Sequence, residues 1–141
     1  TLMHLTAGQI RPVMRAARSH APGGALLLID TANPLLLADA DETADWELER
    51  TLSAPNAAGP IAQYSRWTHD AHEQTVTVDW RFERPDQPPY LAATTYHYHF
   101  PHALIEALQT CGWQPEQLCG EYDESPYAEE SERLIIIARA V

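Results

Sequence analysis

Residues 22–30 read Pro22-Gly23-Gly24-Ala25-Leu26-Leu27-Leu28-Ile29-Asp30, a chain break followed by a short apolar run. A run that is apolar on both faces and bounded by glycines and a polar residue is typical of a parallel strand buried between layers of helices. The pattern returns near the C-terminal end as Leu134-Ile135-Ile136-Ile137-Ala138. The two runs therefore predict two buried strands of an α/β domain.

Helical patterns accompany both runs. Residues 6–20 are predicted to form a helix, because Thr6 is a suitable N-cap and Gln9, three residues later, completes a capping box. Pro101–Cys111 carries a second apolar stripe at helical spacing, and Gly112 is expected to end that helix. Trp113–Tyr122 follows as a predicted strand.

The middle of the sequence changes period. From Trp46 to Phe100 apolar and polar residues alternate, most clearly over 75–82, where Val76, Val78, Trp80 and Phe82 form the apolar set. This alternation indicates antiparallel strands with one buried and one wet face. Tyr64–Thr68 and Ala92–Phe100 are predicted as partner strands, so an antiparallel insertion interrupts the α/β pattern.

Composition limits the function. The 141 residues predict one domain or part of one, and 20 acidic residues against nine arginines give a net charge of −11. A negative field of this size repels phosphate, which disfavours nucleic acid or an anionic membrane as the main partner. No apolar run has the ~20 residues that cross a bilayer. Two cysteines favour a reducing compartment, so a cytoplasmic location is expected.

Several segments occur in a familiar order. These are Thr1-Leu2-Met3-His4-Leu5-Thr6, residues 21–30, His102–Leu108, Cys111-Gly112-Trp113, Gly120–Tyr127 and Ser131–Ile135. Together they resemble the second half of a class I S-adenosylmethionine-dependent methyltransferase over nearly the whole chain. The resemblance implies a partial Rossmann-like sheet in which Ala25–Asp30 is strand five, Trp113–Tyr122 strand six and Arg133–Ala140 strand seven. Strand seven is then expected between the other two and antiparallel, with 46–100 as a lid over the acceptor site.

The resemblance implies methyl transfer from S-adenosylmethionine to a small molecule, with this chain supplying the acceptor-binding half and the lid. The family's glycine-rich loop would precede Thr1, and the sequence contains no G-x-G-x-x-G. We therefore expect residues to be missing from the front, and the 141 residues alone to bind the cofactor negligibly and to be inactive. The alternative is a non-catalytic binding or assembly module that keeps part of this fold.

Candidate site residues follow from the rule that ligands of open α/β sheets bind outside the carboxyl ends of the strands. Met3 and His4 are expected near the cofactor, with His4 as a base or as a residue that orients the acceptor. A surface or helix-capping role for His4 is the alternative. The predicted acceptor-binding residues in the half-domain are Asp30, Asn33, Tyr122, Asp123 and Tyr127. Asn33 before Pro34 and the Ser125-Pro126 turn also suit purely structural roles.

The predicted lid contributes the remaining candidates. Tyr64, Trp67 and Tyr96, with His97, are expected to cover the acceptor, and a place in the lid core is the alternative for the aromatics. The residue types also permit a metal site built from His97 and His99 with other histidines, but their spacing matches no established metal motif and we assign no metal ligand.

Strand five lacks its neighbour, strand four, in this sequence. An open strand edge flanked by apolar surface recruits a partner. We expect a homodimer through that edge or through the lid, or an edge covered by the 6–20 helix or the lid.

Overall fold

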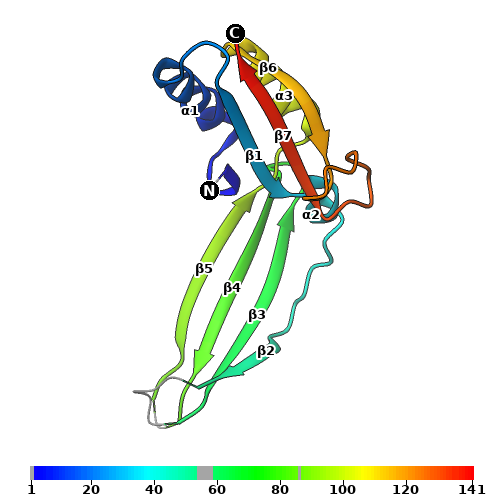
Figure 1. The fold of residues 1–141 in the computed structure, drawn as a ribbon. Helices are drawn as coiled ribbons and strands as arrows, with labels where there is room; N and C mark the ends of the chain where they lie inside the picture. The colour runs from blue at the N-terminus through cyan, green and yellow to red at the C-terminus, as the bar shows by residue number, and fades with distance from the viewer. Residues whose placement is uncertain (1, 54–58, 86) are drawn as a thin grey trace. The chain divides into compact units, whose positions relative to one another are not determined.

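The computed structural model describes residues 2–53, 59–85 and 87–141. The chain divides into two compact units, each with its own sheet (Figure 1). Unit 1 consists of Thr1–Asp39 and His97–Val141, and unit 2 is the intervening segment Ala40–Tyr96. The predicted insertion, 46–100, therefore overlaps unit 2 except for short stretches at each end.

Unit 1 is an α/β unit with a three-stranded sheet. Its elements are the 3-10 helix η1 (Leu2–His4), α1 (Ala7–His20), β1 (Leu26–Ala32), α2 (Pro34–Ala38), α3 (Pro101–Thr110), β6 (Trp113–Cys119) and β7 (Arg133–Ala140). The strand order is β1-β7-β6, and β7 is antiparallel to both neighbours. Within this sheet Ile29 lies opposite Ile136, and Leu118 lies opposite Ile136 from the other side.

This topology confirms the predicted fold class, including strand seven between strands five and six. The direction inferred from the apolar pattern alone was wrong, because both apolar runs pair antiparallel within the described sheet. An unbroken apolar run indicates that a strand is buried on both faces. It does not indicate the direction of the strand relative to its neighbours.

The core of unit 1 lies between this sheet and the helices. Leu134 and Ile136 of β7 are fully buried, as is Leu108 of α3, and Ile10 and Met14 of α1 join the same cluster. Each such side chain contributes roughly 1.5–3 kcal/mol when it leaves water. The predicted helical stripes therefore form the interface with the sheet.

The ends of α1 and α3 meet at Arg18. Its guanidinium donates hydrogen bonds to the carbonyls of Ala21, Gly112 and Val141 at 2.7–3.2 Å. Gly112 has φ 82°, and a Cβ there would lie 3.4 Å from Arg18 Nε. Glycine is thus required after α3 by both its backbone conformation and the close approach of Arg18.

Unit 2 is a four-stranded sheet of order β2-β3-β4-β5. Its strands are β2 (Glu47–Leu52), β3 (Ile61–Asp70), β4 (Thr75–Glu83) and β5 (Tyr90–His97). The predicted alternation appears in the burial of Val76 and Val78, but Trp80 and Phe82 are only half-buried, like the polar residues between them. Two buried polar residues, Gln63 and Ser65, are hydrogen-bonded to Arg50 and Glu49 of β2.

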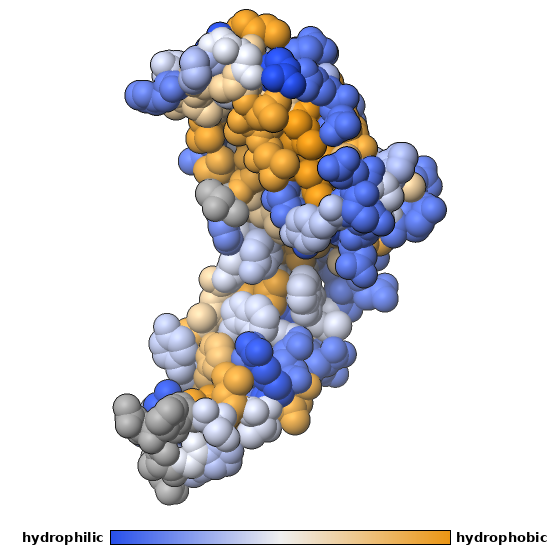
Figure 2. All heavy atoms as spheres, in the orientation of Figure 1, coloured by the Kyte–Doolittle hydropathy of each residue, from blue (hydrophilic) through white to orange (hydrophobic). Residues whose placement is uncertain are grey.

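β1 leaves apolar surface exposed. It ends the strand order of its sheet, so no described strand pairs with its second edge. Leu26 and Leu28 are 59% and 60% exposed, and Figure 2 shows hydrophobic surface gathered where β1 and β7 lie in Figure 1. Beside it, α1 and β1 line a hollow of about 370 Å³. Helix α1 therefore lies beside β1 but does not satisfy the hydrogen-bonding groups of its open edge.

In the described ranges, no helix combines the length and the apolar character needed to cross a membrane.

Self-association through β1 remains a prediction. We expect the purified 141-residue chain to dimerise or oligomerise in multi-angle light scattering, because exposed leucines on an unpaired strand favour association. Leu28→Glu should shift the population to monomer. Leu48→Glu is the control, since Leu48 is 58% exposed but lies on β2 of unit 2. A monomeric unmodified chain would contradict the prediction.

Candidate functional site

Polar side chains gather where β1 ends. Asp30 points from the strand, and Asn33 follows as the N-cap of α2, with Pro34 in the first turn. Asparagine at an N-cap and proline directly after it are favoured, because the asparagine oxygen accepts a free helix N–H and proline has none to satisfy. This local sequence turns the chain at the carboxyl end of β1.

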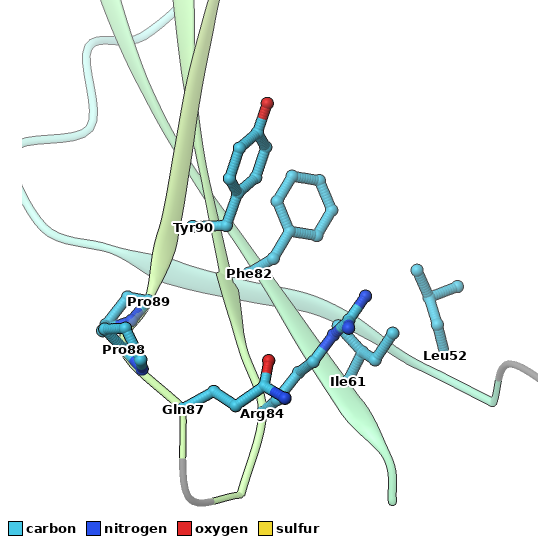
Figure 3. A pocket seen from close by; sticks show the side chains of 8 residues that line it. All are labelled: Leu52, Ile61, Phe82, Arg84, Gln87, Pro88, Pro89 and Tyr90. Atoms are coloured by element: carbon cyan, nitrogen blue, oxygen red, sulfur yellow. The ribbon is translucent and has the colours of Figure 1, made fainter. Parts of the chain in front are cut away.

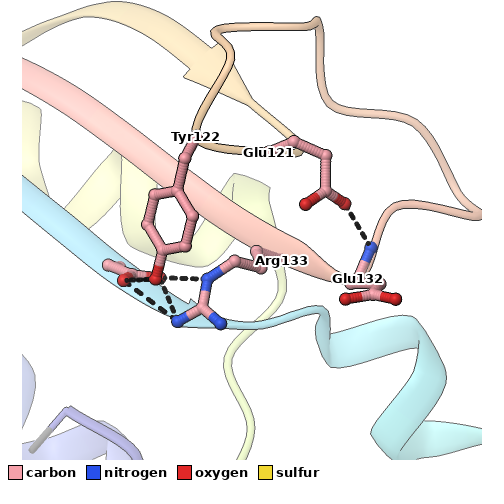
Figure 4. Close-up of polar contacts among 5 residues, drawn as sticks. Glu121, Tyr122, Glu132 and Arg133 are labelled. Carbon is pink, nitrogen blue, oxygen red and sulfur yellow. Dashed lines mark hydrogen bonds and ion pairs between the residues drawn. The ribbon is translucent and has the colours of Figure 1, made fainter.

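Asp30 is the centre of an exposed cluster with Arg133 and Tyr122 (Figure 4). Arg133 donates from Nε and Nη2 to the two carboxylate oxygens at 2.8 and 3.0 Å. The Tyr122 hydroxyl donates to Asp30 Oδ2 at 2.9 Å, and the Arg133 guanidinium lies 4.8 Å from the Tyr122 ring centroid. A bidentate pair of this kind fixes both side chains in one orientation.

The cluster sets protonation states. The hydrogen bond to Asp30 raises the pKa of the Tyr122 phenol and also raises the pKa of Arg133. Tyr122 therefore stays a hydrogen-bond donor and Arg133 stays charged at neutral pH. The arrangement suits orientation of a polar ligand better than abstraction of a proton.

Asn33 is a buried hub. Its side chain is fully buried; Oδ1 accepts from the Leu35 N–H at 3.0 Å and from the Tyr127 hydroxyl at 2.7 Å. Its Nδ2 donates to the carbonyls of Glu129 and Ser131 at 2.8 and 2.7 Å. Burial raises the pKa of Tyr127, which keeps that phenol protonated. Both residues thus anchor the 120–132 connection, and their contact with an acceptor stays a prediction.

Within the 120–132 connection, carboxylates accept hydrogen bonds from backbone N–H groups. The pKa of Asp123 is lowered mainly by a hydrogen bond from the Ser125 side chain, and also by the Ser125 N–H, which donates to Asp123 Oδ1 at 3.0 Å. Glu121 Oε1 accepts from the Glu132 N–H at 3.1 Å (Figure 4). Gly120 is required, since a Cβ there would overlap the Ser131 side chain. Asp123 is exposed and remains available to solvent.

Met3 and His4 lie in η1, beside β1. Leu2 and Leu5, which bracket them, line the same hollow of about 370 Å³ as Asp30. The η1 segment and the end of β1 therefore line one hollow, although Met3 and His4 themselves are not among its lining residues. The roles of Met3 and His4 there stay predictions.

The predicted lid residues divide between the two faces of the unit 2 sheet. Tyr64 and Trp67 are three positions apart on β3 and therefore point to opposite faces. Thr95 of β5 contacts Thr77 of β4, which places His97 on the Tyr64 face and Tyr96 on the Trp67 face. One flat cover made of all four side chains is therefore not formed.

The Tyr64 face holds a stack that the sequence analysis missed. The Arg81 guanidinium lies 4.7 Å from the Tyr64 ring centroid and 5.0 Å from that of Trp46, and Arg66 lies 4.8 Å from Trp46. Arg133 was missed as well, although its position directly before the last apolar run was a usable signal. Both omissions involve arginines whose partners are remote in sequence.

His99 has a structural bond. Its ring Nε2 lies 2.9 Å from the Leu5 carbonyl, which it contacts as a donor, and burial lowers its pKa. Over the described parts of the chain, no three histidine, cysteine, aspartate or glutamate side chains gather as a metal-binding group.

Three comparisons place this geometry among known proteins. No family model and no curated protein matches the sequence. Solved structures do match it. The CcbJ methyltransferase from Streptomyces caelestis is 16% identical with a TM-score of 0.74, covering 99% of this chain and 56% of its own.

Two further matches are sugar-modifying enzymes. An amino pentose methyltransferase from Micromonospora echinaspora, solved with S-adenosylmethionine bound, is 13% identical with a TM-score of 0.66; 97% of this chain and 52% of that chain are covered. A sugar N-methyltransferase from Streptoalloteichus is 13% identical with a TM-score of 0.68, and the coverage is 97% and 51%. The chain spans about half the length of these structures, and it has the class I methyltransferase fold over that half.

Asn33→Ala should lower the free energy of unfolding by about 3 kcal/mol, because it leaves several buried hydrogen-bonding groups without a partner. Tyr127→Phe removes one of these bonds and should cost only about 1 kcal/mol. Urea denaturation measures both values. If both substitutions lowered the free energy of unfolding by the same small amount, Asn33 would not be the residue that anchors the 120–132 connection.

His99 predicts a pH dependence. Its folded pKa is lowered, so the neutral form stabilises the folded state, and this stability is lost as pH falls from about 6.5 through the folded pKa. In urea denaturation between pH 8 and pH 5, the stability advantage of the unmodified chain over His99→Gln should shrink as pH falls. His72→Gln is the control, because the His72 side chain is 92% exposed. If the difference in unfolding free energy between the unmodified chain and His99→Gln stayed constant from pH 8 to pH 5, the lowered pKa of His99 would be refuted.

Proposed function

We propose that this chain is the acceptor-binding half of an S-adenosylmethionine-dependent methyltransferase acting on a small molecule, with unit 2 as its lid. The observation that carries the proposal is the fold match to methyltransferases over 97–99% of the chain. Two of those enzymes act on sugars by their descriptions, which supports an amino sugar as the acceptor class.

The site chemistry is consistent with methyl transfer. The cofactor supplies a methyl group already activated on a sulfonium, so the protein's main task is to hold the acceptor in line. The Asp30 carboxylate, fixed by Arg133, and the hydroxyl oxygen of Tyr122, whose proton is donated to Asp30, offer acceptors for hydroxyl or ammonium groups. His4 is our candidate for the base that receives the acceptor's proton, and Met3 for contact with the cofactor.

The described residues fit only part of the cofactor. The hollow beside η1 and β1 is lined mostly by apolar residues together with Asp30, which suits the methionine end of the molecule. The sequence contains no G-x-G-x-x-G turn for the adenosine end. We therefore propose that the adenosine site is not formed by these 141 residues.

Charge supports a basic or neutral acceptor. The net charge of −11 attracts cations over the whole surface, and the 120–132 connection adds exposed carboxylates near Tyr122. An amine acceptor fits this field better than a phosphorylated one.

Asp30→Ala should weaken binding of an amino sugar such as glucosamine to the chain about ten-fold, because it removes the acceptor oxygen and releases Arg133 and Tyr122. The matched control is Glu116→Ala, which breaks the bidentate Glu116–Arg139 pair on the same sheet and should leave binding unchanged. Titration followed by nuclear magnetic resonance (NMR) gives the dissociation constants.

The second readout is methyl transfer in the protein in which this sequence occurs. Asp30→Ala should lower kcat/KM for the amino sugar about 10–100-fold, because a misplaced acceptor no longer reacts in line. Equal effects of the two variants would contradict the site. Amino-sugar binding with no methyl transfer to any acceptor would favour the non-catalytic binding module.

A further inference from the structure

A pocket of about 680 Å³ lies at the end of the unit 2 sheet where β2 ends and β3 begins (Figure 3). Leu52 and Ile61, which are cross-strand partners, form one wall. Ile61 is buried, so this wall is a continuous part of the sheet rather than a loose surface contact. The volume lies within the range of small-molecule sites.

The opposite wall is aromatic. The rings of Phe82 on β4 and Tyr90 on β5 lie 6.1 Å apart and tilted by 41°. Tyr90 is 67% exposed, so its ring packs against Phe82 and leaves much of its surface open to a ligand. Pro88 and Pro89 restrict the backbone before Tyr90 and thereby hold that side of the pocket.

One cation enters this apolar pocket. The Arg84 side chain extends between Phe82 and Leu52 in Figure 3. It forms no hydrogen bond or ion pair with any residue that the structure describes, a property it shares with Arg15 of α1. The neighbouring carboxylate, Glu83, is held by Arg81 at 3.1 Å and does not compensate Arg84.

A second polar group lies beside it. The Gln87 carboxamide also lines the pocket and makes no hydrogen bond to the described residues. A guanidinium and an amide at the border of an apolar hollow provide several donors for one anionic group. Arg84 and Gln87 are both exposed at the rim of the pocket, and among the described residues no carboxylate pairs with the Arg84 guanidinium. Asp86, which lies between them in the sequence, is outside the described residues.

We propose that this pocket binds a small organic carboxylate with an aromatic or aliphatic body. Guanidinium pairs with carboxylate through two parallel hydrogen bonds, and the body fills the space between the Leu52–Ile61 wall and the Phe82–Tyr90 wall. The site lies within unit 2 alone. It goes beyond the proposed methyl transfer and does not rest on it.

The test uses naphthalene-2-carboxylate as the probe and NMR of the methyl-labelled chain as the readout. Binding should shift the methyl signals of Leu52 and Ile61 and leave those of Leu26 and Leu28 on β1 unchanged. Naphthalene-2-carboxamide, the neutral analogue, should bind about ten-fold more weakly, because it forms no charge-assisted pair.

Variants assign the polar and apolar contributions. Arg84→Gln should weaken the carboxylate about ten-fold and remove its advantage over the amide, whereas Arg15→Gln should change neither ligand. Tyr90→Ala should weaken both ligands equally, because it removes apolar contact only. Circular dichroism of each variant confirms that it is folded.

Shifts confined to β1, equal binding of acid and amide, or an Arg84→Gln variant that binds like the unmodified chain would each overturn the proposal. Absence of any binding at millimolar probe concentration would overturn it as well.

Discussion

The structure depends on β7 lying between β1 and β6. Its Leu134 and Ile136 are fully buried, and the strand joins β1 (residues 26–32) to β6 (residues 113–119), which are remote from each other in sequence. Its register also builds the site. Asp30 lies opposite Ile135, so Arg133 is its diagonal neighbour on the same face. A slip by one residue would turn Arg133 toward the helices and leave Asp30 without its partner.

The 120–132 connection between β6 and β7 is anchored at the end of β1. Asn33 is buried at the end of β1 and takes hydrogen bonds from, or gives them to, four groups, three of them in the 120–132 connection. Exposed carboxylates are tolerated there because Glu121 and Asp123 each accept from a backbone N–H. A rigid polar rim thus follows β1, and it supports the proposed acceptor site better than a loose acidic loop would.

Local signals predicted much of this. The capping box is present, since Gln9 Oε1 accepts from the Thr6 N–H at 2.9 Å, and the predicted apolar run Leu134–Ala138 lies within β7. Strand direction was not predictable, because burial on both faces is compatible with either direction. The role of Asn33 depends on partners more than 90 residues away, which no local pattern shows. The separation of Tyr64 from Trp67 was readable from their odd spacing.

The methyltransferase fold and the proposed acceptor site therefore rest on one arrangement of strands. Cross-strand NMR contacts of the 141-residue chain test it most directly. The account predicts nuclear Overhauser effects between backbone protons of β1 and β7 throughout the register from Leu26↔Arg139 to Ala32↔Arg133, together with contacts from Leu118 to Ile136. Contacts joining β1 to β6, or a β7 paired on one side only, would contradict it.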